Sequence, residues 1–504
     1  MGMVLFTKPP RLLLYEGDPL ESDYKVLVVP VWQDEQDTPV LEGYAGQLDE
    51  ALGGLLRSAI DAGGFKASPG ELYRVYSKGK LVVFTGLGKS NVAINVKLEN
   101  VRRGFARAVR EVVERNDSLL ACVGDLGDEL EVREAVIASL LAAYRLEAFR
   151  SERKRKLERV GVHGYRVNVD EVMGIVEGVY LARDVANAPP TYLTPPKLAE
   201  VVRDLFSGLD NVDVDVFDYE RLVREGFGGI VNVGKGSEYK PRLIVIRYNG
   251  GEGDPIAVIG KTIVFDTGGI NLKTTERMQG MRADKAGGAA ALGIAWATAK
   301  LGLRLNLVVM MPAAINAPSG SAYLPSDVIR MWDGTMVEVN NTDAEGRLVL
   351  GDALAYAAKS LNARELIDLA TLTGAIVIAL GPLIAGLFTR NKDMEEDILK
   401  ASSVSGEKIW PMPLEDSYKA FMTRASPLGD IANSALMRAA GAIYGALFLE
   451  RFTHGKPWMH LDIAGPGIGL DADGVTPDYW PQGLAPGYGV RLILEYLRSK
   501  ISST

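Results

Sequence analysis

The chain has 504 residues, of which 47% are hydrophobic and 24% charged, and its formal net charge is −8 at pH 7. These values exclude disordered and fibrous classes, and the length favours two domains over one. Because lysines and arginines are scattered among acids, the composition does not indicate a broad basic surface for nucleic acid. A basic run at 150–159 (RSERKRKLER) is typical of a solvated helix face, with contact to an acidic partner as the alternative.

A single cysteine, Cys122, lies in the apolar run 118–125 (SLLACVGD). It excludes an intramolecular disulfide and is typical of a buried small side chain in a reducing compartment, so we expect a cytoplasmic protein. We also expect no secretory signal and no membrane anchor. The stretch 366–388 is long enough to cross a bilayer. Asp368, Gly381 and Pro382 interrupt it, which favours a buried strand that continues into a core helix.

Apolar strand-like runs alternate with helical patterns, which predicts an α/β fold with two α/β domains. In the first domain we expect strands at 25–32, 80–88 and 118–125, and helices at 99–115 and 131–156. Residues 160–171 (VGVHGYRVNVDE) have the composition of a connection. The predicted limits are therefore 1–165 for a smaller N-terminal domain and 172–504 for a larger C-terminal domain.

The C-terminal domain is predicted to hold a mixed central sheet flanked by helices on both faces. A helix at 172–186 leads into 187–197, where four prolines force an extended or turning path. Beyond it we expect helices at 286–301 and 346–360, and strands at 241–250, 255–265, 303–316, 335–341 and 365–371.

Two common kinds of site do not fit the residues. The three histidines, His163, His454 and His460, are too few for a histidine-rich zinc site, and none lies near a serine or cysteine in a nucleophile turn. The sequences GKS at 88–90 and GKT at 260–262 lack the glycine that a phosphate-binding loop places five residues before its second glycine. Neither Ser-His or Cys-His hydrolysis nor nucleotide binding is indicated.

Four carboxylates lie where predicted strands end and helices begin. Asp266 ends one strand, and Asp284 comes 18 residues later, before small residues at 286–288 that permit close approach. Asp343 and Glu345 follow a second strand. Asp284 and Asp343, each taken alone, could simply cap a helix. Together, four carboxylates would offset the charge of two divalent cations that share a water, which favours a two-metal site.

The same segments carry a family resemblance. The run NTDAEGRL at 341–348, with GK at 260–261, FDTGGINLK at 265–273 and MRADKAGGAA at 281–290, closely resembles the leucyl (cytosol) aminopeptidase family. The resemblance continues through NAPPTYLTP, IDLATLTGA, WPMPL and PWMHLDIAG and covers residues 180 to 465. It implies a metal-dependent aminopeptidase that removes leucine and other apolar N-terminal residues from peptides. The implied cofactors are two divalent ions, manganese or zinc, with a hydroxide that bridges them.

Carried over position by position, the resemblance implies a role for individual residues. It implies that the two ions are bound by Lys261, Asp266, Asp284, Asp343 and Glu345. Lys273 would polarise the scissile carbonyl, and Arg347 would hold a bicarbonate-like anion that shuttles a proton to the leaving amine. The first side chain of the substrate would lie against Met281 and the backbone around Thr371, Leu372 and Gly374. Ordinary core packing is the alternative for Met281. The family also implies a homohexamer with the C-terminal domains at its centre.

The chain departs from the family's pattern at three places. Lys285 stands where methionine is usual, directly beside Asp284, and adds a cation that could alter metal preference or affinity. Thr267 replaces the commoner serine and keeps the hydroxyl, and the segment 484–493 (LAPGYGVRLI) aligns loosely.

Two alternatives compete with an aminopeptidase. An aspartic protease is suggested by IVFDTGG at 263–269, but that mechanism needs a second matching aspartate, and DAGG at 61–64 follows a helical pattern. A non-catalytic assembly or nucleic-acid-binding protein with the peptidase fold would be expected to have lost a ligand, Lys273 or Arg347, and all of these are present. Catalysis is therefore favoured, with binding through the run 150–159 as a secondary role.

Overall fold

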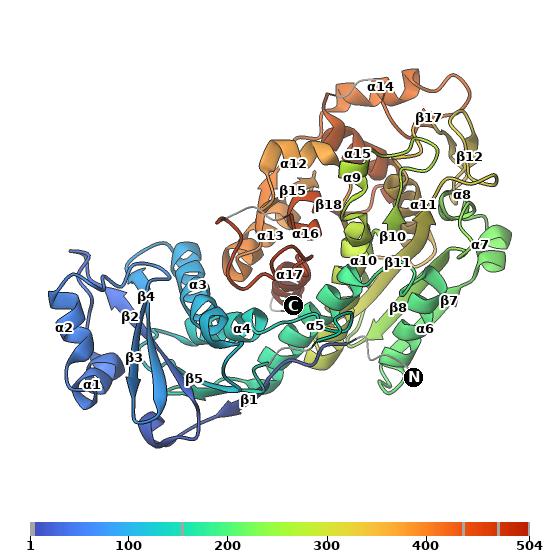
Figure 1. The fold of residues 1–504 in the computed structure, drawn as a ribbon. Coiled ribbons are helices and arrows are strands. Elements are labelled where there is room, and N and C mark those ends of the chain that lie inside the picture. Colours follow the sequence, from blue (N-terminus) through green and yellow to red (C-terminus); the bar gives the residue numbers. More distant parts are fainter. Residues whose placement is uncertain (1–5, 153–155, 436–438, 471–473, 502–504) are drawn as a thin grey trace. The chain divides into compact units, whose positions relative to one another are not determined.

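The structure, a computed structural model, describes residues 6–152, 156–435, 439–470 and 474–501 (Figure 1). The chain divides into two compact units, Met1–Tyr180 with Asp473–Gln482 and Leu181–Ala472 with Gly483–Thr504. We call them the N-terminal unit and the C-terminal unit. The division after Tyr180 falls inside the helix α5 (Val169–Asn187). The domain limits drawn from the sequence stay a prediction.

A six-stranded sheet forms the centre of the N-terminal unit. Its strand order is β1-β6-β5-β2-β4-β3, and neighbours are parallel except for the pair β3 and β4. The strands are β1 (Arg11–Leu14), β2 (Val26–Gln33), β3 (Leu72–Ser77), β4 (Lys80–Lys89), β5 (Ser118–Cys122) and β6 (Arg159–His163). The predicted strands are β2, β4 and β5, whose continuous apolar runs are buried as in a covered parallel sheet. Cys122 ends β5 and is buried, as predicted.

The start of the predicted connection at 160–171 is a strand instead. β6 lies between β1 and β5 and pairs with both, and its Val160 and Val162 are buried. The prediction was wrong here because so short a run shows no periodicity, whereas pairing on both sides satisfies its backbone groups.

The helices of the N-terminal unit are η1 (Pro19–Glu21), α1 (Gly43–Ala51), α2 (Leu55–Asp61), α3 (Ile94–Val112), α4 (Glu129–Ala142) and most of α5. α3 is the helix predicted at 99–115. The helix predicted at 131–156 is too long, because α4 ends at Ala142. Two residues later, Tyr144 is buried and packs edge-on against Tyr180, with 5.0 Å between ring centroids. This tertiary contact outweighs the helical propensity of the residues that follow.

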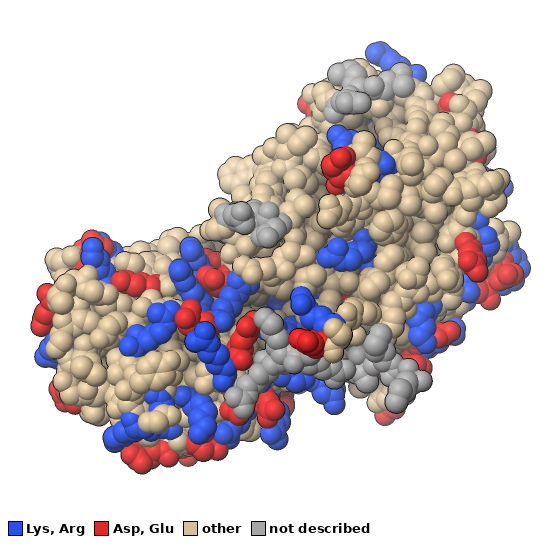
Figure 2. All heavy atoms as spheres, in the orientation of Figure 1, with Lys and Arg blue, Asp and Glu red and all other residues tan. Residues whose placement is uncertain are grey.

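The basic run 150–159 is described only in part, since residues 153–155 lie outside the described residues. Its last residue, Arg159, belongs to β6, pairs with Asp23 at 2.7 Å and lies over the ring of Tyr24. On the face shown in Figure 2, basic and acidic side chains are interspersed. That nucleic acid is not a partner stays a prediction.

The C-terminal unit is built on a mixed sheet, as predicted. Its strand order is β16-β15-β18-β14-β9-β11-β8-β7, and β10 pairs with the last part of β11. Strands β9, β14 and β18 are parallel neighbours, whereas β8 and β15 run antiparallel to the strands beside them in the middle of the sheet. The strands are β7 (Val212–Phe217), β8 (Arg242–Asn249), β9 (Ile256–Gly260), β10 (Thr262–Asp266), β11 (Asn306–Asn316), β14 (Glu365–Ala370), β15 (Ile384–Thr389), β16 (Lys408–Pro411) and β18 (Trp458–Asp462). A separate small sheet holds β12 (Val328–Arg330), β13 (Met336–Glu338) and β17 (Ile431–Ala432).

Helices flank this mixed sheet (Figure 1). One hydrophobic core joins β9, β11 and β14 to α8, α11 and α15, while α10 packs on the same strands and against α17. The helices are α6 (Pro195–Phe206), α7 (Tyr219–Glu225), α8 (Gly228–Gly234), α9 (Thr275–Met278), η2 (Met281–Lys285), α10 (Ala286–Leu301), α11 (Gly346–Lys359), α12 (Gly374–Leu380), α13 (Lys392–Ser405), η3 (Asp416–Tyr418), α14 (Lys419–Arg424), α15 (Gly441–Glu450), η4 (Arg451–Thr453), α16 (Ala464–Ile468) and α17 (Val490–Ile501).

The apolar stretch 366–388 folds as β14, α12 and β15. The predicted buried strand is present, since Leu366–Ala370 is buried throughout. The predicted core helix is wrong, because α12 has seven residues and its Ile378 is 91% exposed. Gly381, with φ at +72°, ends the helix after two turns. Within the described residues, no helix is both long and apolar enough to cross a membrane.

Candidate active site

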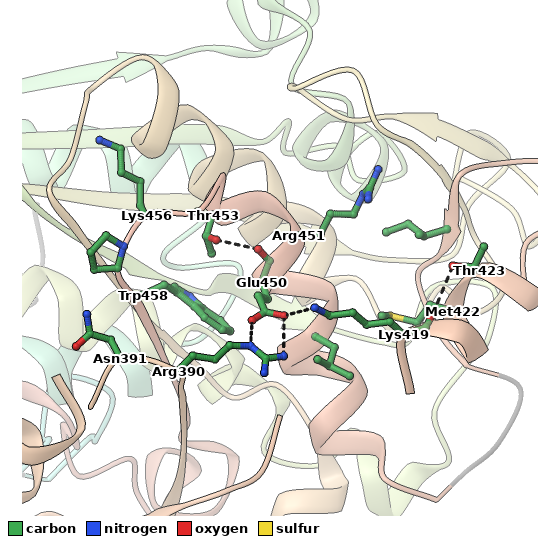
Figure 3. A pocket seen from close by; sticks show the side chains of 14 residues that line it. Arg390, Asn391, Lys419, Met422, Thr423, Glu450, Arg451, Thr453, Lys456 and Trp458 are labelled. Carbon is green, nitrogen blue, oxygen red and sulfur yellow. Dashed lines mark hydrogen bonds and ion pairs between the residues drawn. The ribbon is translucent and has the colours of Figure 1, made fainter. Parts of the chain in front are cut away.

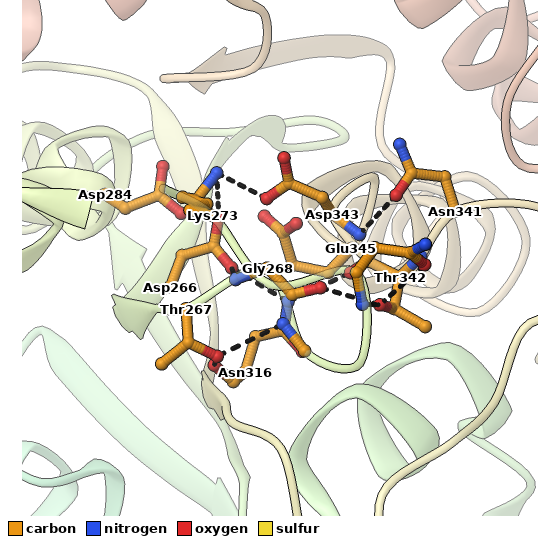
Figure 4. A network of polar contacts seen from close by, with 12 residues as sticks. Asp266, Thr267, Gly268, Lys273, Asp284, Asn316, Asn341, Thr342, Asp343 and Glu345 are labelled. Carbon is orange, nitrogen blue, oxygen red and sulfur yellow. Dashed lines mark hydrogen bonds and ion pairs between the residues drawn. The ribbon is translucent and has the colours of Figure 1, made fainter. Parts of the chain in front are cut away.

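The predicted carboxylates meet at the carboxyl ends of the central strands (Figure 4). Asp266 is the last residue of β10, Asp284 lies in η2, and Asp343 and Glu345 directly precede α11. Oxygens of Asp266, Asp343 and Glu345 lie within 4.8 Å of one another. Open α/β sheets place their functional groups at this edge, which is why segments distant in sequence converge here.

Lys261 joins the fourth carboxylate to this cluster. It follows the last residue of β9 and is 2% exposed, and its Nζ lies 2.9 Å from Asp284 Oδ1 and 2.9 Å from Glu345 Oε1. The same Nζ donates to the carbonyl oxygen of Thr371 at 3.0 Å. Burial lowers the pKa of Lys261, but the charges of Asp284, Glu345 and Asp266 raise it more, and the net pKa is raised.

Lys273 faces the cluster from the loop after β10. Its Nζ lies 2.8 Å from Asp266 Oδ2 and also pairs with Asp343 (Figure 4). Its side chain is 14% exposed, so it is more accessible than Lys261. Burial lowers the pKa of Lys273, but the neighbouring carboxylates raise it by more, so the net pKa is raised and the side chain is an ammonium at neutral pH.

Among the described residues, Asp284 Oδ2 and Glu345 Oε2 are buried without a donor, and buried Asp343 Oδ1 has only its ion pair with Lys273. Burial, followed by the charge of Asp266, raises the pKa of Glu345 to about 8. Burial also raises the pKa of Asp284 to about 6, against the opposing effect of Lys261. Burying ionised carboxylates without enough donors or cations is costly, so bound cations would stabilise the charged form of this cluster.

Asp266 is held by a layer of neutral donors. Its Oδ1 accepts hydrogen bonds from the backbone N–H of Gly268 and from Nδ2 of Asn316, each at 2.8 Å. Thr267 keeps the hydroxyl expected from the family, and its Oγ1 donates to the carbonyl oxygen of Asn316 at 2.8 Å. Asn316, the last residue of β11, was missed in the sequence, although it ends a strand as Asp266 does.

Arg347 lies in the first turn of α11 and is buried. Its Nη1 donates to the carbonyl oxygen of Asn433 at 2.9 Å, and Nε has no hydrogen-bond partner in the part of the chain that the structure describes. Burial lowers the pKa of Arg347 to about 10, although Glu345 and Asp462 oppose the change, so the guanidinium is charged at neutral pH. A buried cation with an unused N–H can hold an oxyanion.

The predicted substrate-binding residues flank the cluster on two sides. Met281 begins η2, which carries Asp284, and is partly buried. Thr371 donates from Oγ1 to Asp284 Oδ1 at 2.7 Å, so it contacts a predicted ligand directly. Leu372 is partly buried, and Gly374 is the exposed first residue of α12.

A buried aspartate that was missed in the sequence binds the backbone of Leu372 and Thr373. Asp462 ends β18, and its Oδ1 accepts from the backbone N–H groups of Leu372 and Thr373 at 3.1 and 3.4 Å. Its Oδ2 accepts from Thr373 Oγ1 at 2.6 Å. A strand-end acid was the signal that identified Asp266, and it applies equally to Asp462.

Lys285, the departure beside Asp284, is fully buried. Its Nζ donates to the carbonyl oxygens of Ala188, at 3.0 Å, and Arg282. Burial, with the nearby Arg282, lowers the pKa of Lys285 to about 7. The side chain thus connects η2 to the end of α5.

A cleft of about 690 Å³ lies elsewhere in the C-terminal unit, between α14, α15 and the start of β18 (Figure 3). Glu450 lies within it and pairs with Arg390 and, at 2.9 Å, with Lys419. No predicted site residue lines this cleft. Because the Glu450 carboxylate is already paired with two cations, we assign this cleft no part in catalysis.

Two family profiles match the sequence. That of the cytosol aminopeptidase family, catalytic domain, matches residues 180–494, and that of the same family's N-terminal domain matches residues 28–153. The chain belongs to the cytosol aminopeptidase family. The resemblance drawn from NTDAEGRL and the neighbouring segments is therefore confirmed, and the protein is a hydrolase of the aminopeptidase class.

Relatives and solved structures of this family cover nearly the whole chain. A probable cytosol aminopeptidase of Aeropyrum pernix is 54% identical over 497 residues, which is 98% of either chain. One of Syntrophotalea carbinolica is 38% identical, covering 94% of this chain and 97% of the relative. A mutant of tomato leucine aminopeptidase superposes with a TM-score of 0.84 at 29% identity, over 97% of this chain and 96% of that one. The bottromycin maturation enzyme BotP in complex with Mn gives 0.81 at 30% identity, over 95% and 99%. The two-domain α/β fold is confirmed.

Proposed function

We propose that the protein is a metal-dependent aminopeptidase that removes leucine and other apolar N-terminal residues from peptides in the cytoplasm. The observation that carries the proposal is the buried carboxylate cluster with its oxygens lacking donors. In the proposal, two divalent ions are bound by Lys261, Asp266, Asp284, Asp343 and Glu345. Lys261 must lose a proton to bind a metal ion, and the positive charge of the ions would lower its pKa and so favour that loss.

The donor set of this site fits two divalent cations. Asp284 Oδ2 and Glu345 Oε2 are buried without partners, and a cation would satisfy both. Four carboxylates would balance the charge of two divalent ions, and oxygen ligands with one nitrogen suit manganese or zinc. Mn is bound by the similar enzyme BotP, which favours manganese.

In the proposed reaction, two ions bound here would supply a nucleophilic water, polarise the scissile carbonyl and anchor the substrate's α-amino group. Lys273 stabilises negative charge that develops on the carbonyl oxygen, because its ammonium is held in place by Asp266 and Asp343 and remains partly exposed. Arg347 would hold a bicarbonate-like anion through its Nε–H, which no described residue accepts, and such an anion would supply a proton carrier for the leaving amine.

The first side chain of the substrate lies in the proposal between Met281 and the segment 371–374. Both border Asp284, one from η2 and the other through the hydroxyl of Thr371. Met281 and Leu372 give this pocket apolar walls, which supports a preference for leucine-like residues.

A homohexamer is the proposed assembly. The C-terminal unit exposes large apolar side chains, among them Ile378 at 91%, Leu428 at 67% and Trp410 at 61%. Contacts between subunits would remove such surface from water. Sedimentation analysis of the purified protein tests the assembly separately from its activity.

The test of function is hydrolysis of leucine 4-nitroanilide after chelation and re-addition of manganese, zinc, cobalt or magnesium. Activity is expected to return with manganese or zinc, and Glu345→Gln to lower it by more than the about 10- to 100-fold typical of an outer-shell change. Glu338→Gln is the matched control, because Glu338 is also buried but binds Ser426 and Leu428 instead. A folded protein that no metal activates, or a Glu345→Gln variant as active as the control, contradicts the proposal.

A further inference from the structure

Asp462 is a fully buried carboxylate that accepts its hydrogen bonds from neutral donors, most of them in the turn at 372–373. Besides Leu372 and Thr373, its Oδ1 accepts from the backbone N–H of Ala464 at 3.3 Å. Its Oδ2 accepts the hydroxyl of Thr373 at 2.6 Å. Both oxygens are thus occupied, and the carboxylate clamps the chain just after β14.

The residue that directly precedes the clamped turn contacts two of the proposed metal ligands. Thr371, the residue immediately before it, accepts a hydrogen bond from Lys261 Nζ through its carbonyl oxygen at 3.0 Å. The hydroxyl of the same threonine donates to Asp284 Oδ1 at 2.7 Å. One residue therefore orients both the lysine and an aspartate of the site.

Strand register explains why Asp462 reaches this turn. β18, β14 and β9 are parallel neighbours, with Asp462 opposite Ala370 and Leu369 opposite Gly260. The residues that follow β14 and β9 therefore emerge at the same edge as the Asp462 side chain. The contacts run across three strands, from Asp462 to the turn, from the turn to Thr371, and from Thr371 to Lys261.

We propose that Asp462 is a positioning residue that fixes the turn at 372–373 and, through the adjoining Thr371, the placement of Lys261 and Asp284. This inference rests on the proposed function, in which both of these residues bind metal. Outer-shell groups that orient ligands typically contribute about 10- to 100-fold in metal affinity or activity. Loss of the clamp is therefore expected to weaken metal binding although no ligand is altered.

Two substitutions at this position separate positioning from charge. Asp462→Asn keeps an oxygen at the Oδ1 position, so the N–H groups of Leu372, Thr373 and Ala464 retain their acceptor. Asp462→Ala leaves these donors and the Thr373 hydroxyl without one. We expect Asn to keep metal affinity near that of the unaltered protein and Ala to weaken it by about 10- to 100-fold.

Asp368 provides the control for a general loss of stability. It is also fully buried, lies in β14, and binds Trp458 Nε1 at 2.7 Å and His460 Nδ1 at 2.6 Å. Asp368→Ala thus removes a buried carboxylate of the same sheet but not the clamp on the turn. It is expected to lower the unfolding temperature and to leave metal affinity unchanged.

The experiment is calorimetric titration of Mn²⁺ into the chelated full-length protein and its variants, with thermal unfolding of each. Thr371→Val, which removes only the hydroxyl bond to Asp284, tests the last contact and replaces Asp462→Ala if that variant does not fold. Weaker binding by Asp462→Ala or Thr371→Val, with recovery in Asp462→Asn, supports the inference. Unchanged affinity in both, or an equal loss in Asp368→Ala, overturns it while the proposed function stands. An unaltered protein that binds no Mn²⁺ overturns the proposed function as well.

Discussion

Gly346 lies between two site residues, Glu345 and Arg347, and its lack of a side chain makes room for Lys261. A Cβ added at Gly346 would lie 2.5 Å from Cε, 2.7 Å from Nζ and 2.8 Å from Cδ of Lys261. Ordinary contacts of a Cβ begin at 3.4 Å. An alanine here would therefore force the lysine side chain to retreat.

The size of the effect follows from this geometry. The end of the Lys261 side chain must move by about 1 Å to restore an ordinary contact, and a misplacement of this size can cost about 100-fold in rate. Its Nζ cannot retreat freely, because it is held at 2.9–3.0 Å by Asp284, Glu345 and Thr371. Gly346 is the first residue of α11, where alanine is at least as well tolerated as glycine by the helix itself. Gly346→Ala should thus lose function without a matching loss of stability.

The assay compares Mn²⁺ affinity, kcat/KM for leucine 4-nitroanilide at saturating metal, and unfolding temperature. We expect Gly346→Ala to lose about 100-fold in kcat/KM and to bind Mn²⁺ more weakly. Gly320→Ala is the control, because no atom lies within 4 Å of a Cβ at that position. If Gly346→Ala keeps the activity and affinity of the control, the close packing of Gly346 on Lys261 is not what places the lysine.

His460 predicts a pH dependence of stability. Burial lowers its pKa, but Asp368 at 2.6 Å raises it more, so the folded pKa lies above the unfolded one. This stabilisation is fully present below about pH 6.5 and is lost as the pH rises through the folded pKa. His460→Gln should flatten that part of the urea-unfolding profile, and an unchanged slope contradicts the assignment. Because the pKa of Lys285 is lowered to about 7, the lysine is mostly protonated at pH 6, and there Lys285→Met removes a buried positive charge beside Asp284 and should lower the calorimetric Kd for Mn²⁺. An unchanged or higher Kd at that pH shows that the charge does not reach the site. Lys273→Met should lower kcat by about 100-fold or more without weakening Mn²⁺ binding, whereas equal losses of both would make it a ligand.

Much of the fold could be predicted from local patterns, and the misses have physical causes. The strands β2, β4 and β5 are continuous apolar runs that only a covered sheet buries. β6 was missed because its stability comes from pairing with β1 and β5, which lie far away in sequence. The helix at 131–156 was overextended because the docking of Tyr144 on Tyr180 is a tertiary contact.

The site could be predicted in part for a related reason. Asp266 and Asp284 stand at junctions where strands end and helices begin, and this local rule found them. The local sequence around Lys261 is typical of a surface lysine at a strand end, and only the family resemblance singled it out. Asn316 and Asp462 also end strands, so the same rule could have singled them out. Their hydrogen-bond partners lie 50 and 89 to 90 residues away, so their roles depend on strand register, which one sequence does not reveal.

The small residues after Asp284 connect what the sequence shows to what it hides. A Cβ at Gly287 would lie 2.1 Å from the carbonyl oxygen of Leu369, and one at Gly288 would lie 2.0 Å from Thr262 Oγ1. The first turn of α10 therefore packs directly on the backbone of β14 and on the side chain of Thr262 in β10. Because Asp284 precedes this turn, the close packing carries its carboxylate to within 2.9 Å of Lys261. The glycines that are visible in the sequence thus bring Asp284 to Lys261, whose proposed role in metal binding the local sequence does not indicate.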